Sequence, residues 1–289
     1  MSRKRTALAL SLGLLFAGGA AAETLPHRDD FKMNSIGGGD FRDYVMEHVS
    51  EDDGWAQLMQ TIGVLHNHMH EIMSDFARHA RDETGDDQVP AFGTRISGGQ
   101  WSDYRAGLED AETEGPWRDL VQITEIMHDR VHHMMVSAVF YDQVSRQRDL
   151  DLEELLGERA PHDQADTLPA ADTLAVNGMA GTEFRRHVWT ADFEEPLRHA
   201  MMQKVTVFDS MMDDVMTQLA QYGLGKLERD CRPPDFGSRM NTSSWANYAE
   251  RVSACEEEQW QDLVLVTGLA RDRIDHMLSK LHAYDTAGD

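Results

Sequence analysis

The sequence is poor in cysteine and lacks the common catalytic motifs. Its two cysteines, Cys231 and Cys255, are 24 residues apart, a separation that fits neither a metal site nor a redox pair. The motif Cys-x-x-Cys-His is absent, which excludes covalently attached c-type haem. Glycine-rich phosphate loops and the Gly-x-Ser-x-Gly nucleophile motif are absent as well. The sequence therefore gives no reason to predict an enzyme, although a catalytic metal site needs no such motif.

Positive charge is also scarce. Lysine and arginine number 27 against 51 acidic residues, only five of the 27 are lysine, and the formal net charge is −24. An acidic excess of this size repels nucleic acid and anionic lipid. The composition therefore predicts a soluble protein with no nucleic-acid partner.

A long apolar run occurs only at the N-terminus. Three basic residues at 3–5 precede an apolar stretch at 7–17, and three alanines at 20–22 resemble a signal-peptide cleavage site. The run is short for a membrane span, and no second one follows. We therefore predict a signal peptide over 1–22, a periplasmic or secreted protein, and no membrane insertion after the signal is removed. An uncleaved N-terminal anchor is the alternative.

No stretch alternates apolar and polar residues as a half-buried β-strand would. Instead, apolar residues recur every three or four positions, which is the pattern of helices with one buried face. Four long helices are predicted over 55–82, 117–146, 198–223 and 260–283, with shorter ones near 40–50, 101–113 and 183–193. The fold class is therefore predicted to be all-α, a bundle of long antiparallel helices with shorter connecting helices. The predicted buried residues are Leu58, Leu65, Met69, Leu120, Val131, Met201, Phe208, Met212 and Leu263.

Two details of this prediction concern breaks between helices. Glycines at 37–39 and 98–99 are predicted to lie in loops. No helix breaker separates the last short helical segment from the last long one, so 244–283 could form one long or gently bent helix.

The two halves of the chain resemble one another. Leu25-Pro26 recurs as Leu168-Pro169 at an offset of 143 residues, and Trp117 recurs as Trp260 at the same offset. Scattered matches that keep one register indicate an internal repeat. We therefore predict a tandem duplication, with a first helical repeat over 23–150, a linker over 151–167 and a second helical repeat over 168–289.

Two of the long segments carry histidines four residues apart. His66 and His70 lie on the first, and His128 and His132 lie at matching positions on the second, 62 residues later. Histidines at i and i+4 project from one face of a helix, which is a common way to offer two imidazoles to one metal ion. If the two helices pair antiparallel, the four rings can converge on one ion.

Other potential ligands lie near these histidines. Met73 and Met135 would flank the four rings, and His68, Glu71 and His133 are further candidates. Histidine and methionine together in an exported protein favour copper, with zinc or nickel as alternatives. The predicted function is therefore a periplasmic metal-binding or metal-buffering protein. Binding is expected to weaken below about pH 6.5, because a protonated imidazole cannot coordinate a metal.

The second half has Asp209, Asp213, Arg271 and Asp275 where the first half has the four histidines. We expect an ion-pair cluster there, with Arg271 paired to one of the aspartates and with no soft metal bound.

An acid and a histidine hold matching positions in both halves. These are Glu71 with His133, and Asp214 with His276. We interpret each as a structural hydrogen-bonded pair, with a site for a hard metal ion as the alternative.

Two other functions stay open, as does the state of the cysteines. Histidine and methionine in a helical bundle can hold a b-type haem, which would make the protein an electron carrier. The histidines can instead form a polar layer in a structural or interaction protein without a cofactor. A disulfide between Cys231 and Cys255 is expected in an oxidising compartment, and two buried free thiols are the alternative.

Overall fold

The structure, a computed structural model, describes residues 36–49, 54–82, 85–110, 115–145, 181–191, 193, 195–255 and 257–287. These residues are predominantly helical and include no β-strand, so the all-α prediction is confirmed. The predicted signal peptide and the predicted linker lie outside the described residues. Among the described helices, none combines the length and the apolar composition that crossing a membrane requires.

The described helices follow one another in a similar order in each half of the chain. The first half contains α1 (Gly38–His48), α2 (Gly54–Asp82), α3 (Gly98–Asp110) and α4 (Pro116–Ser145). The second half contains α6 (Gly181–Thr190), α7 (Pro196–Lys226), the 3-10 turn η3 (Arg229–Cys231), α8 (Thr242–Val252) and α9 (Glu258–Ala287). The four predicted long helices correspond to α2, α4, α7 and α9.

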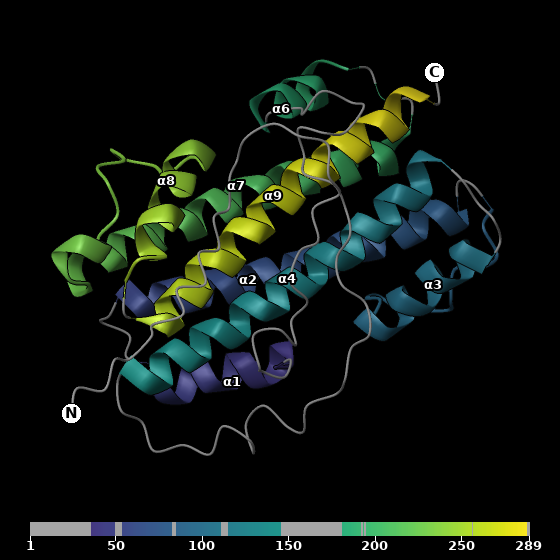
Figure 1. Cartoon of the computed structure of the whole chain (residues 1–289). Coiled ribbons are helices and arrows are strands. Elements are labelled where there is room, and N and C mark those ends of the chain that lie inside the picture. Colours follow the sequence, from purple (N-terminus) through teal and green to yellow (C-terminus); the bar gives the residue numbers. More distant parts are fainter. Residues whose placement is uncertain are drawn as a thin grey trace, which may run out of the picture.

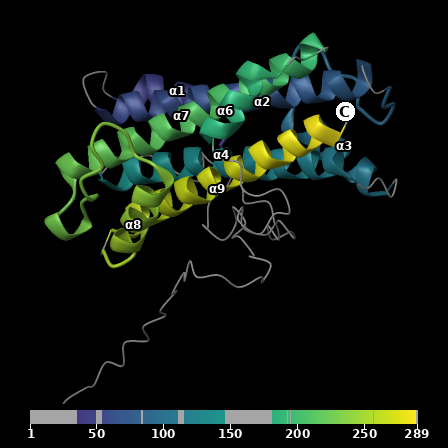
Figure 2. The ribbon, with the colours of Figure 1, turned by 90° about the horizontal axis from the view of Figure 1, so that it is seen from above.

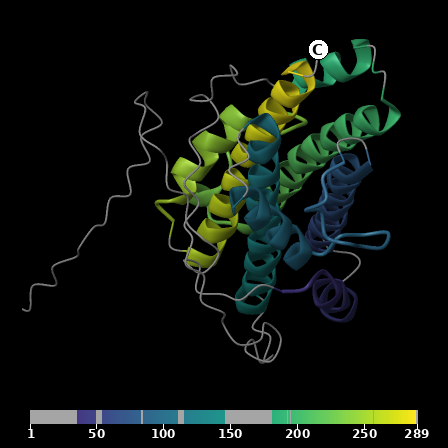
Figure 3. The same ribbon diagram turned by 90° about the vertical axis from the view of Figure 1, so that its right-hand side faces the viewer.

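The four long helices run side by side and form the bundle, with the short helices at its outside (Figure 1, Figure 2). Helix α2 packs against α4 and α7, and α4 packs against α9 (Figure 3). Side-chain contacts give the directions of α2 and α7. The ring of Trp55, at the start of α2, contacts Tyr222 near the end of α7, with centroids 5.0 Å apart. His79 lies near the end of α2, 3.9 Å from Glu195 just before α7, so the two helices are antiparallel.

The bundle has one core that both halves share. The nine residues predicted to be buried are all fully buried, and they belong to a single apolar cluster drawn from α2, α4, α7 and α9. Burial of a leucine, methionine or phenylalanine side chain stabilises a fold by about 1.5–3 kcal/mol. Because the main helix pairs join one half to the other, neither half has a separate core.

The predicted continuous helix over 244–283 is wrong, because the chain turns between α8 and α9. After Val252 the backbone N–H groups of Ala254 and Cys255 donate to carbonyls three residues earlier, which tightens the last turn and ends α8. Cys255 is joined to Cys231 by a disulfide, with Cα atoms 5.7 Å apart. The bridge holds this turn against η3, and α8 folds back along α9.

The predicted loops at the glycines are also partly wrong. Gly38 and Gly39 begin α1, and Gly98 and Gly99 begin α3. The histidines that pack against two of these glycines, described below, explain why these helix starts have glycine.

Equivalent positions in the two halves make similar contacts. The indole N–H of Trp117 donates to the hydroxyl of Tyr104, and that of Trp260 donates to the hydroxyl of Tyr248, both at 2.8 Å. The tandem duplication itself stays a prediction.

Candidate metal centre

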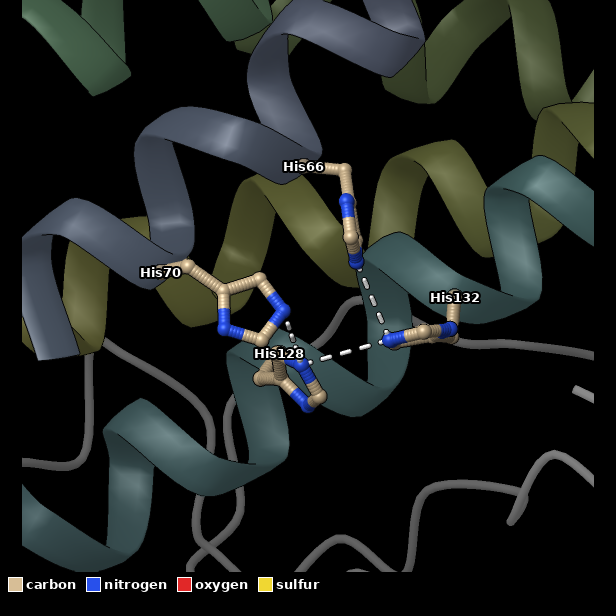
Figure 4. A group of neighbouring side chains, drawn as sticks. All are labelled: His66, His70, His128 and His132. Atoms are coloured by element: carbon tan, nitrogen blue, oxygen red, sulfur yellow. Dashed lines mark hydrogen bonds between the residues drawn. The ribbon is translucent and has the colours of Figure 1, made fainter. Parts of the chain in front are cut away.

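Four histidines from two antiparallel helices meet at one point of the bundle. Helix α2 contributes His66 and His70, α4 contributes His128 and His132, and all four rings face one another (Figure 4). The Nε2 atoms of His66 and His132 lie 3.2 Å apart, and those of His70 and His128 lie 3.3 Å apart. The Nε2 atoms of His128 and His132 lie 3.2 Å apart. We call these four side chains the His tetrad, and it could hold a metal ion.

Main-chain carbonyls fix the orientation of two of the four rings. Nδ1 of His70 donates to the carbonyl oxygen of Ile96 at 3.1 Å, and Nδ1 of His132 donates to that of Ile36 at 3.0 Å. A carbonyl can only accept, so both Nδ1 atoms carry a proton, and in the neutral rings both Nε2 atoms direct a lone pair into the tetrad. Metal-binding histidines in proteins are usually held in this way.

Two glycines make room for the other two rings. A Cβ atom on Gly38, the first residue of α1, would lie 2.3 Å from Cε1 of His66. A Cβ atom on Gly98, the first residue of α3, would lie 2.8 Å from Cε1 of His128. Both distances are shorter than any real carbon–carbon contact, so only glycine allows these ring positions. The chain begins two short helices at these points instead of continuing a loop.

The tetrad has an approximate twofold symmetry. His66 packs on the start of α1 and His128 packs on the start of α3. His132 bonds the residue two positions before α1, and His70 bonds the residue two positions before α3. Each short helix therefore supports one histidine from each long helix. All four helices position the side chains of the tetrad.

The spacing of the nitrogen atoms suits a small metal ion. Imidazole nitrogens bind zinc at about 2.0–2.1 Å, so four of them around a tetrahedral ion lie about 3.3 Å apart. The three separations of 3.2–3.3 Å match this value, and all four ligand atoms lie within 4.8 Å of one another. A small movement of the rings would close the remaining gaps.

Burial keeps two of the imidazoles neutral. Desolvation, together with the neighbouring His132 and His70 and the charge of Arg95, lowers the pKa of His66 from 6.5 to about 3. Desolvation and Arg95 lower the pKa of His70 to about 4, although the hydrogen bond to Ile96 opposes this. These two rings are therefore neutral in the pH range in which a free imidazole, with a pKa near 6.5, gains its proton.

One side of the tetrad is accessible to solvent. His66 and His70 expose 4% and 9% of their surface, whereas His128 and His132 are only half-buried. An ion could therefore reach the tetrad from the side that α4 forms.

The other predicted ligands containing nitrogen or oxygen lie outside the tetrad. His68 donates from Nε2 to the carbonyl oxygen of Lys204 on α7 at 3.0 Å. Glu71 is exposed and lies 3.9 Å from the amino group of the same lysine. His133 is buried and accepts from Arg130 at 2.9 Å. Of the seven predicted ligands with these donor atoms, the structure brings together only the four on the shared face.

The predicted methionine ligands, Met73 and Met135, are fully buried one turn beyond His70 and His132. Their positions are those of core packing residues.

The acid–histidine positions show a contact that the sequence patterns did not indicate. Arg130 donates to His133, and Arg273 donates to His276 at 2.7 Å, each along a single helix. The arginine three residues before each histidine is visible in the sequence, but its burial is not. Arg130 and Arg273 are both almost completely buried.

The second half holds a salt-bridge cluster at the equivalent place. Arg271 bonds Asp209, lies 3.0 Å from Asp275 and lies 3.7 Å from Asp213. The predicted pairing of Arg271 with an aspartate is confirmed, and the guanidinium contacts all three. Burial raises the pKa of Asp275 to about 6, although Arg271 opposes the shift. A side-chain cation thus occupies the position that a metal ion would take among the histidines.

Comparison of the chain with protein-family models, with curated proteins and with solved structures finds no match. The function has to be inferred from the chemistry of the site.

Proposed function

We propose that the protein binds a copper ion at the His tetrad and acts as a metal-binding or metal-buffering protein in the periplasm or outside the cell. The observation that carries the proposal is the convergence of four Nε2 atoms from α2 and α4. In the neutral rings, two of these atoms direct a lone pair into the tetrad, because the opposite ring nitrogens donate to Ile36 and Ile96.

Several features favour a metal site over a purely structural polar layer. Burial lowers the pKa values of His66 and His70, so both are neutral and ready to coordinate at neutral pH. Glycine at 38 and 98 admits rings that any other residue would displace. A polar layer would require neither the convergence of the four Nε2 atoms nor glycine at positions 38 and 98.

The choice of copper rests on the donors and on the predicted export. Imidazole suits copper, zinc and nickel, and copper is the metal that a histidine-rich and methionine-rich exported protein favours. Zinc is the alternative, because the nitrogen spacing also fits a tetrahedral zinc ion.

A b-type haem fits the tetrad poorly. Axial ligation places the flat macrocycle between two ligand nitrogens. In the tetrad, two further imidazole nitrogens lie within 4.8 Å of any such pair, where the macrocycle would have to sit.

The test is a titration of the metal-free full-length protein with copper and with zinc, followed by elemental analysis. One tightly bound ion per chain is expected. Replacement of both His66 and His128 by alanine should abolish binding, because one ligand from each helix is lost. The control is His68→Ala on the same helix, which should bind normally because His68 is bonded to α7. Absence of a bound ion in the unaltered protein, or equal binding by the double variant, would leave a polar layer as the explanation.

A further inference from the structure

The His tetrad contains no negatively charged ligand. Among the described residues, the cluster consists of four imidazoles and no carboxylate. Neutral ligands leave the full charge of the ion in place, which is one unit for Cu(I) and two for Cu(II) or Zn(II). The cost of placing an ion in a poorly solvated site rises with the square of its charge, so it is about four times higher for the divalent ions.

The surroundings of the tetrad add positive potential. Helices α1 and α3 begin at Gly38 and Gly98, and the rings of His66 and His128 pack directly on these first residues. The N-terminal end of a helix carries the equivalent of about half a positive charge. At α1 the first-turn carboxylate of Asp40 offsets part of this charge, whereas α3 has no acidic residue in its first turn, so the α3 end in particular disfavours a second positive charge on the bound ion.

Arg95 contributes a full positive charge. It precedes Ile96, whose carbonyl oxygen holds the ring of His70. Its guanidinium donates to the side chain of Asn67, which lies between His66 and His70 on α2, at 3.1 Å. The equivalent residue of the second half, Arg239, instead lies 3.5 Å from Asp213 and 3.4 Å from Asp214. Arg95 interacts with Glu71, whereas Arg239 lies against two aspartates, so the arginine charge is offset less in the first half.

The nitrogen spacing is compatible with Cu(I). Cu(II) prefers a square or tetragonal arrangement, in which neighbouring nitrogens lie about 2.9 Å apart and opposite ones about 4.1 Å. Cu(I) has no such preference and accepts a tetrahedral set. From the neutral ligands and the positive surroundings, we infer that the tetrad holds copper as Cu(I) and discriminates against Cu(II). This inference rests on the copper site proposed above.

The experiment compares both oxidation states on the metal-free full-length protein. Cu(I) is titrated without oxygen against bicinchoninate, and Cu(II) is titrated against nitrilotriacetate. Cu(I) should bind at least about tenfold more tightly than Cu(II), which places the potential of bound copper about 59 mV or more above that of aqueous copper. A potential at or below that of aqueous copper would overturn the inference.

A pair of surface variants tests the contribution of charge. Arg95→Gln should reduce the preference for Cu(I) by about threefold at low ionic strength, and by less in high salt, because the side chain is exposed. Arg239→Gln is the matched control and should change neither affinity. Equal effects of the two variants would refute the role of Arg95.

The outcomes separate this inference from the proposed function. Tight binding of Cu(II) or Zn(II) with weak binding of Cu(I) refutes the inference and leaves the metal site intact. Failure to bind any of the three ions refutes both.

Discussion

Replacement of Gly38 by alanine should weaken metal binding although no ligand is removed. The added Cβ atom would lie 2.3 Å from Cε1 and 2.6 Å from Nδ1 of His66. An ordinary carbon–carbon contact begins near 3.4 Å, so the ring has to move by about 1 Å. Metal–ligand distances tolerate only about 0.2 Å, and changes in groups that support a ligand typically cost 10–100-fold in affinity. We expect a loss of that size.

The neighbouring glycines supply the controls. A Cβ atom on Gly39 or Gly99 would meet no atom within 4 Å, so alanine at these positions should leave metal affinity unchanged. Alanine is also the better helix former, and Gly39→Ala should stabilise the protein by up to about 1 kcal/mol. The metal affinity of Gly98→Ala should lie between those of Gly38→Ala and Gly39→Ala, because its Cβ atom would be 2.8 Å from Cε1 of His128.

A third control separates metal binding from folding. Gly181 is the equivalent of Gly38 in the second half, and a Cβ atom there would lie 2.4 Å from the carboxylate of Asp209. Gly181→Ala and Gly38→Ala should both reduce the free energy of unfolding by about 1–3 kcal/mol, as overpacking usually does. Only Gly38→Ala should reduce metal affinity. The assays are competitive metal titration and denaturant unfolding of the metal-free protein. If Gly38→Ala and Gly39→Ala bind metal equally well, the packing argument is refuted.

Three further predictions concern stability. In the metal-free protein, the unfolded chain protonates His66 and His70 near pH 6.5, whereas the folded protein keeps them neutral to about pH 3 and 4. Their contribution to the free energy of unfolding should therefore fall as the pH is lowered from 6.5 toward 4, and glutamine at both positions should remove this part of the slope in pH-dependent denaturation. Arg271→Met should destabilise the protein by about 3–5 kcal/mol in denaturant unfolding, because three partly or fully buried carboxylates lose their cation; a loss below about 1 kcal/mol would contradict the buried pairing. Replacement of Cys231 and Cys255 by serine should lower the free energy of unfolding by about 3 kcal/mol. An unchanged value would show that the bridge does not constrain the unfolded chain.

The helices and the four central ligands could be predicted because both depend on periodicity within one segment. The stripe of Leu58, Leu65 and Met69 identifies the buried face of α2, and His66 and His70 follow from the same spacing. Antiparallel pairing of α2 with α4 then brings the two histidine pairs together.

The supporting parts of the site could not be predicted, because they depend on contacts between distant segments. Nothing in the local sequence shows that the carbonyls of Ile36 and Ile96 face two imidazoles. A pair of glycines usually indicates a loop, and only the neighbouring ring shows why the first residue of α1 has to be glycine. The turn after α8 was missed for a similar reason, since the segment has no breaker and its end depends on the packing of α8 along α9.

The pairing of the long helices also has a consequence for the two sites. Helix α2 packs on α7, which holds the equivalent place in the second half, and α4 packs on its own equivalent, α9. Contacts between equivalent surfaces are those of a symmetric homodimer. The helices α2 and α4 hold the His tetrad between them, and α7 and α9 have a matching place. The two sites therefore differ in chemistry. Between α7 and α9, Arg271 and its three aspartates join the helices by salt bridges.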